Sequence, residues 1–148
     1  MRDNWNYHRG DIYLADLGSG EGCEQGGKRP VVVIQNDIGN HFSPNITIVP
    51  LTSKDKKPNQ PTHYELKDVR GLTTRSTALG ECLATIAKER VIRYMGKLPA
   101  KDMTGIEEAV KAHLGFYIPE CVLENTVFRR ILSTSLLIPV SSEKAAIL

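Results

Sequence analysis

The sequence predicts a mainly β domain, a small twisted barrel or sandwich that carries one helix. Two observations favour this class: short segments rich in strand-forming residues are joined by Gly, Pro and Asn turns, and one strongly periodic helical segment follows them late in the chain. The chain has 148 residues, of which 41% are hydrophobic and 24% charged, so it suits one domain with its own core.

The strands are expected in the first two thirds of the chain. Five segments have strand composition: 11–17, 31–34, 46–52, 62–66 and 77–88. The second begins after Pro30 and is so dense in valine that we expect it to be buried on both faces. Pro50 indicates an edge or a bulge, and Gly80 indicates a bulge or bend in the last strand.

Loops with distinct compositions separate these strands. The first, 18–27, is rich in glycine, and 53–61 is polar with three lysines. Between the second and third strands, 36–44 contains Asn-Asp, Gly-Asn and Ser-Pro pairs, which are typical of turns.

The one strongly predicted helix lies just before Gly115. Asp102 or Thr104 is expected as its N-cap, and Thr104 and Glu107 have the spacing of a capping box. Residues with helical spacing form its expected buried stripe: Ile106, Ala109, Val110, His113 and Leu114. Gly115 is placed to end the helix.

The chain divides into a body, 1–115, and an extension, 116–148. Apolar residues from Val127 to Leu132 and Ser135 have helical spacing, and Pro139 would end such a helix. We expect this helical tail to pack on the body or on a partner subunit.

Charge and cysteine content narrow the class of protein. The formal net charge is only +2, so any nucleic-acid site is a local groove and not a broad basic surface. Cys23, Cys82 and Cys121 are odd in number and widely spaced, which argues against a disulfide framework or a zinc site. The polar N-terminus has no signal-peptide pattern and no apolar run approaches a membrane span, so we expect a soluble, cytoplasmic protein.

Familiar catalytic motifs are absent from the sequence. The segment 22–28 has the frame of a phosphate-binding loop, but Arg29 stands where Ser or Thr is needed, and the chain enters a strand instead of a helix. What remains is Arg29 beside a glycine loop, Thr52 at the end of a strand, and the lysine loop after it. Arginine can hold a phosphate in a bidentate grip and a threonine hydroxyl can donate to it, so the set suits phosphodiester binding or cleavage. Taken alone, exposed Arg and Thr residues of this kind are more often ordinary solvated surface.

In chain order, several motifs resemble the MazF/PemK toxin family. They are RGDIYLADL at 9–17, EQGGKRP at 24–30, VIQND at 33–37, SP at 43–44, VPLTS at 49–53 and PTH at 61–63. The resemblance implies an SH3-like small β-barrel of the MazF/CcdB type with a C-terminal helix. It also implies a homodimeric toxin of a type II toxin–antitoxin module, a sequence-specific mRNA interferase that needs no metal and no other cofactor. The expected partners are single-stranded RNA and a MazE-like antitoxin peptide.

The same resemblance assigns site residues. Arg29 and Thr52 are the implied catalytic pair, for attack of an RNA 2′-OH on the adjacent phosphate, which leaves a 2′,3′-cyclic phosphate and a 5′-OH end. RNA binding is assigned to Glu24, Gln25, Lys28, Asn36, Ser53 and Lys54. An arginine stays protonated in nearly all settings, so it is better suited to stabilise the pentacovalent phosphate than to act as base. His63 is a minor candidate base, since imidazole titrates near neutral pH.

One segment departs from the family pattern. Where many relatives carry Gln-x-Arg-Thr-Ile-Asp-Lys, this chain has Cys82, Ala84 and Ala87 at the Gln, Arg and Asp positions. The resemblance places those polar groups in the RNA groove or at its rim, so the change bears on the recognised sequence and on activity. Two other functions stay open: a non-enzymatic toxin like the CcdB gyrase poisons, which share this fold, and a degenerate module that binds antitoxin or RNA without cutting.

Overall fold

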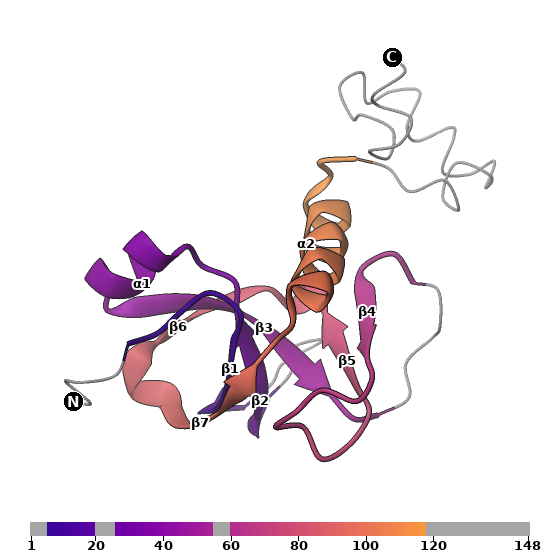
Figure 1. The fold of residues 1–148 in the computed structure, drawn as a ribbon. Helices are drawn as coiled ribbons and strands as arrows, with labels where there is room; N and C mark the ends of the chain where they lie inside the picture. Colours follow the sequence, from indigo (N-terminus) through magenta and orange to yellow (C-terminus); the bar gives the residue numbers. More distant parts are fainter. Residues whose placement is uncertain (1–5, 20–25, 55–59, 118–148) are drawn as a thin grey trace.

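The computed structural model describes residues 6–19, 26–54 and 60–117 (Figure 1). Their elements, in chain order, are β1 (Asp11–Asp16), β2 (Lys28–Val33), α1 (Asp37–Phe42), β3 (Asn45–Thr52), β4 (His63–Leu66), β5 (Ser76–Leu79), η1 (Gly80–Cys82), β6 (Ala84–Ala87), η2 (Lys88–Arg90), β7 (Val91–Lys97) and α2 (Ala100–Leu114). Cys82 lies half-buried in η1, and Cys23, Cys121 and the predicted helical tail lie outside the described residues. Among the helices described, none has the length and apolar character needed to cross a membrane.

The strands form one antiparallel sheet that curls on itself. Five of them lie in the order β7-β1-β2-β3-β6, and β5 and then β4 continue from the end of β3. The chain passes from β6 to β7 through the single turn η2, so the two outer strands of the five are joined directly. Hydrogen bonds between the described strands do not close the ring. The barrel-like, mainly β fold with a C-terminal helix is therefore confirmed, in an open form.

The valines of β2 divide the interior into two cores. Val31 and Val33 point into a cluster enclosed by the curled sheet, together with Tyr13, Ile48 and other residues. Val32 points to the opposite face, into the core beneath α2. All three valines are fully buried, and each such burial is worth about 1.5–3 kcal/mol relative to exposure. The prediction of a strand buried on both faces is confirmed.

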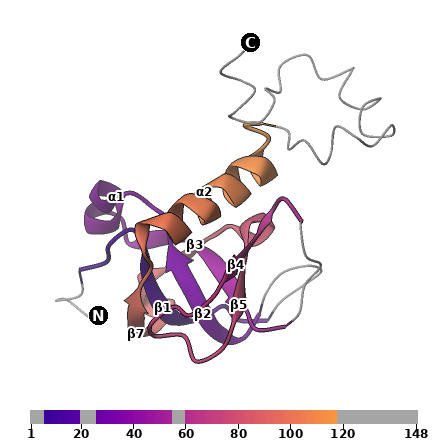
Figure 2. The same ribbon diagram turned by 45° about the vertical axis from the view of Figure 1, so that its right-hand side comes forward.

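Helix α2 covers the second core. Figure 2 shows it running diagonally across one face of the sheet. Ile106 and Val110 pack against that face, as the apolar spacing predicts, and Met103, which was not in the predicted stripe, packs beside them. Gly115 ends the helix in the left-handed conformation, with φ 77°, and its N–H donates to the carbonyl of Ala112.

The predicted start of α2 and part of its stripe are wrong. The helix begins after Pro99, one turn before the expected N-caps, because proline suits a helix start and leaves no N–H unpaired there. Asp102 is instead a buried helical residue that accepts a hydrogen bond from the Tyr64 hydroxyl at 2.8 Å. His113 and Leu114 are exposed, since the helix runs past the edge of the sheet.

Three other expectations are corrected. The segment predicted as turns contains α1, because the Asn36 side chain accepts a hydrogen bond from the Gly39 N–H at 2.8 Å and caps a short helix. Pro50 lies in an interior strand, at the point where the second neighbour of β3 changes from β6 to β5. The predicted strand 77–88 is two strands, β5 and β6, separated by η1. The break begins at Gly80, where a bulge or bend was expected, and β7 was not predicted at all.

Candidate functional site

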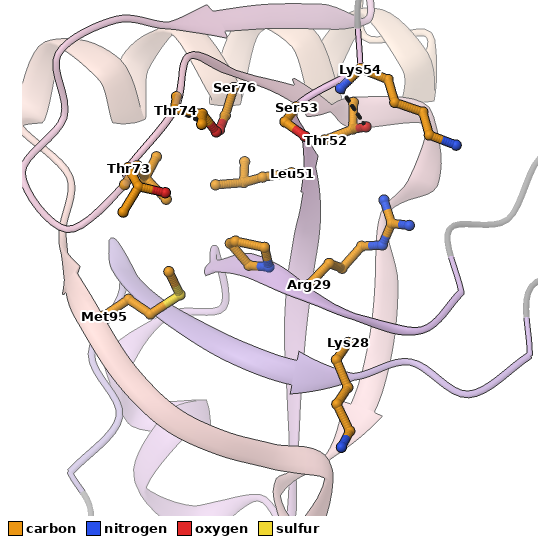
Figure 3. A pocket seen from close by; sticks show the side chains of 12 residues that line it. Lys28, Arg29, Leu51, Thr52, Ser53, Lys54, Thr73, Thr74, Ser76 and Met95 are labelled. Atoms are coloured by element: carbon orange, nitrogen blue, oxygen red, sulfur yellow. Dashed lines mark hydrogen bonds between the residues drawn. The ribbon is translucent and has the colours of Figure 1, made fainter.

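A cavity of about 330 Å³ opens at one end of the sheet (Figure 3). It lies where β2 begins, β3 ends and β5 begins, because antiparallel neighbours bring the start of one strand beside the end of the next. Its floor is apolar, with Pro30 and Leu51 from the two central strands and Met95 from β7. Leu51 belongs to the core beneath α2, so the floor rests on rigid packing.

Arg29 and Thr52 come together at this cavity. The pairing of β2 with β3 sets Val31 opposite Pro50, and the same register carried two residues further would place Arg29 opposite Thr52. The Arg29 Nε donates to the Gly26 carbonyl oxygen at 3.0 Å, which holds the side chain near its own loop. Thr52 is only 5% exposed, and the Lys54 N–H donates to its Oγ1 at 3.3 Å.

The polar part of the lining is cationic and rich in hydroxyls. Lys28, Arg29 and Lys54 supply the charge, and no carboxylate is among the described residues that line the cavity. Five hydroxyl side chains complete it: Thr52, Ser53, Thr73, Thr74 and Ser76. Figure 3 shows the Arg29 and Lys54 side chains on the same side of the cavity as Thr52, while Lys28 is turned away from them. A cavity lined by positive charges and hydroxyl donors, with no carboxylate to compete for them, can bind an anion such as a phosphodiester.

The wall opposite Arg29 comes from the segment 72–76, which was not predicted as part of the site. Gly71 lies directly against β7 with a φ of +100°, and the Cβ of any other residue there would overlap the Met95 carbonyl oxygen. Ser76 is buried and its Oγ donates to the Thr74 carbonyl at 3.1 Å. These contacts bring the segment beside Met95. A run of hydroxyl residues just after a Gly was the only signal that could have drawn attention to it.

The remaining predicted site residues lie partly at the cavity and partly away from it. Asn36 follows the far end of β2 from Arg29, where it caps α1. His63 pairs with Leu79 on β5, about 10 Å along that strand from Ser76 at the cavity. Ser53 and Lys54 line the cavity as expected. Glu24 and Gln25 lie outside the described residues.

His63 is engaged in a buried pair instead. Its Nε2 lies 2.6 Å from Glu81 Oε1, and only 10% of the His63 side chain is exposed. Burial alone would raise the pKa of Glu81, but hydrogen bonds from His63, the backbone and Thr62 outweigh it and hold that pKa below its usual range. The structure therefore separates the minor candidate base from Arg29 and Thr52.

The fold and the cavity together define a small barrel-like protein with an anion site at the end of its sheet. The family model for the PemK-like, MazF-like toxin of type II toxin–antitoxin systems matches residues 8–114. The chain belongs to this PemK/MazF family.

Individual relatives agree with that assignment. Endoribonuclease MazF of Staphylococcus saprophyticus is 41% identical over 110 residues, which cover 74% of this chain and 92% of the relative. Endoribonuclease EndoA of Bacillus subtilis is 43% identical over 107 residues, covering 72% and 92%.

Solved structures share the fold. MazF of Deinococcus radiodurans matches with a TM-score of 0.67 at 20% identity, over 76% of this chain and 99% of that one. A mycobacterial endoribonuclease solved in complex with its cognate antitoxin matches with a TM-score of 0.63 at 23% identity, over 74% of this chain and 95% of that one.

Proposed function

We propose that this chain is the toxin of a type II toxin–antitoxin module, a cytoplasmic, sequence-specific endoribonuclease that cuts single-stranded RNA without a metal ion. The observation that carries the proposal is the meeting of Arg29 and Thr52 at one cationic, acid-free cavity. The names of its relatives, MazF and EndoA endoribonucleases, point to the same activity.

The reaction is an internal transfer at phosphorus. The ribose 2′-oxygen bonds to the adjacent phosphorus as its proton passes to solvent water. The bond from phosphorus to the 5′-oxygen breaks, and its electron pair stays on that oxygen, which takes up a proton. The products are a 2′,3′-cyclic phosphate and a 5′-OH end. In this reaction Arg29 stabilises the extra negative charge on the pentacovalent phosphate and donates a proton to the leaving oxygen, and Arg29 is then reprotonated by water. Thr52 donates its hydroxyl to a phosphoryl oxygen, and Lys54 adds positive charge beside it.

Single-stranded RNA fits this site better than a duplex. The net charge of +2 leaves little for a long phosphate backbone, whereas three cations gather around one small cavity. Bases of a single strand are unstacked and open to contact, which allows sequence to be recognised in a short groove.

Two protein partners follow from the surface. Helix α1 exposes Ile38 and Phe42, 75% and 80% accessible, and their spacing of four residues puts them on one side of the helix. We assign this apolar pair to the contact with a second copy of the chain. A cognate antitoxin with an acidic segment would compete with RNA, because the cavity lining is cationic. In light scattering, Phe42→Asp should give a monomer, whereas Leu114→Asp, at an exposed apolar residue on α2, should not. A dimer with Phe42→Asp contradicts the assignment.

The decisive experiment is RNA cleavage by purified protein in EDTA, with analysis of the ends produced. Wild type should cut and leave cyclic phosphate ends. Arg29→Ala should lower the rate about 10³-fold or more, since a catalytic arginine on a phosphoryl group contributes on that scale. Lys101→Ala removes an exposed cation from α2 and serves as the matched control.

Each alternative function predicts a different result. A strict requirement for added Mg²⁺ would overturn the proposed chemistry. A non-enzymatic toxin like the gyrase poisons would stay toxic in cells when both Arg29 and Thr52 are replaced. A binding module would retain RNA at the same affinity but release no product.

A further inference from the structure

The cavity has two chemically different ends. Arg29 and Lys54 lie at one end, and Thr73 and Met95 lie on the side away from them (Figure 3). Leu72 and Met95 are partly buried and pack against the core beneath α2, so this second end has an apolar face. Thr73 is exposed there, and its hydroxyl forms no hydrogen bond with another of the described residues.

The wall that carries Thr73 is held on both sides. Before it, Val69 is buried in the core and the Leu72 N–H donates to the Val69 carbonyl at 3.1 Å, which closes a tight turn. Gly71 seats this turn on the backbone of β7. After it, Arg75 pairs with Glu65 on the neighbouring strand. A hydroxyl fixed in this way can discriminate between ligands, because little ordering is lost when it binds.

We propose that the Thr73–Met95 end of the cavity is a base-binding subsite, in which Met95 and Leu72 contact the face of one RNA base and Thr73 reads its edge. The proposal rests on the endoribonuclease function proposed above and names residues that determine its specificity. One nucleotide matches the two ends of the cavity when its phosphate lies at Arg29 and its base lies against the apolar face. The volume of about 330 Å³ lies at the small end of the range for ligand sites, roughly 300–1,000 Å³, and so suits a single nucleotide.

The chemistry at each contact is specific. A thioether and a leucine side chain are polarizable and apolar, so they favour the flat face of any base. A threonine hydroxyl donates one hydrogen bond and accepts up to two, so it favours a base edge that presents a polar group at that point over an edge that presents none. Contact with the face of the base therefore sets the affinity for RNA, and contact with the edge of the base sets which base is preferred.

The test compares cleavage maps of a long RNA library with randomised sequence. Thr73→Val keeps the shape of the side chain and removes only its hydroxyl. It should change the relative use of bases at one position beside the cut by about three- to tenfold, the range of one net hydrogen bond. Met95→Gln keeps the length of the side chain but makes it polar, and should raise KM for all sites without changing kcat. Thr104→Val, an exposed threonine on α2, is the control and should give the wild-type map.

The outcomes separate this subsite from the proposed function. If wild type cuts and the Thr73→Val map is unchanged, the subsite is overturned while the endoribonuclease stands. If wild type does not cut, the proposed function fails, and the same proteins are compared by the composition of the RNA they retain. An unchanged composition with Thr73→Val would again overturn the subsite, and a change at one base position would support it. Unfolding curves of the variants confirm that each protein is folded.

Discussion

Gly71 links the packing of the sheet to the shape of the cavity, and replacing it with alanine tests that link. Two effects oppose the new methyl group. The φ of +100° is unfavourable for a residue with a Cβ, and that Cβ would overlap the Met95 carbonyl oxygen and lie 3.0 Å from the Met95 carbonyl carbon. Both atoms are backbone, so no flexible side chain can move aside.

The two effects can be given separate magnitudes. A left-handed conformation costs a residue with a Cβ about 1–2 kcal/mol. Relief of the overlap requires the 70–72 turn and β7 to separate by about 1 Å, since ordinary contact between heavy atoms needs roughly 3.5 Å. Overpacking of this kind costs about 1–3 kcal/mol. Gly71→Ala should therefore lower the free energy of unfolding by about 2–5 kcal/mol in total.

Gly115→Ala is the matched control for this variant. Gly115 also has a positive φ, +77°, but nothing lies within 4 Å of the Cβ that would be added. It should therefore show only the backbone cost of about 1–2 kcal/mol. Urea denaturation measures both free energies. The difference between the two variants isolates the close approach of the turn to β7.

Cleavage rates complete the test under conditions where both variants are folded. A displacement of about 1 Å at a wall of the site should cost up to about 10²-fold in RNA cleavage for Gly71→Ala. Gly115→Ala should cleave at the wild-type rate. Equal stability of the two variants would refute the close approach of the turn to β7. A destabilised Gly71→Ala that cleaves normally would refute the role of this wall in the site.

Three other outcomes follow from single contacts. Because hydrogen bonds hold the pKa of Glu81 below its usual range despite burial, the stability it contributes is present above the pKa of an unfolded glutamate and is lost as pH falls through the lower, folded value. Glu81→Gln should thus flatten the acid limb of a plot of unfolding free energy against pH, and an unaltered limb would contradict the pairing with His63. Gly105→Ala should destabilise the protein in urea, although alanine favours a helix by about 1 kcal/mol, because the new methyl would overlap the Tyr64 ring; a gain in stability would show that Tyr64 moves freely. Thr52→Ala should lower kcat for RNA cleavage about 10²-fold while Thr52→Ser retains most of it, and equal rates would remove Thr52 from the proposed mechanism.

Local chemistry was enough to predict the elements whose residues act locally. Three consecutive valines, 31–33, put apolar side chains on both faces of a strand, so burial of both faces could be predicted. Gly115 ends a helix through its own positive φ. The same reasoning missed α1 and predicted turns there, because it did not anticipate that the Asn36 side chain would cap a short helix. It also placed the start of α2 too late. A hydrogen bond from the partly buried Tyr64 allows Asp102 to sit inside the helix, and no pattern near Asp102 in sequence reveals that partner.

Some residues of the candidate site could likewise be identified from the sequence, and others could not. Arg29 and Thr52 were identified because short motifs surround each of them, and the register of β2 with β3 gives the physical reason that they meet. Thr73 and Met95 reach the cavity only through tertiary packing, since Gly71 joins two segments more than twenty residues apart. His63 failed as a cavity residue for the opposite reason. Its family motif lies near the lysine loop in sequence, but β4 carries its side chain to the far end of β5.

The departures from the family pattern lie apart from the cavity. Ala84 and Ala87 are on β6, which pairs with the first half of β3, Asn45 to Ile48, whereas the cavity lies where β3 ends. Cys82 lies in η1, and none of the three residues lines the cavity. Loss of polar groups at these positions therefore leaves the cations and hydroxyls of the site intact. Because α1 precedes β3 directly and β6 pairs with its first half, the altered strand lies on the α1 side of β3, away from the end of β3 that carries Thr52. The departures are thus better placed to alter how RNA or a partner approaches than to abolish cleavage.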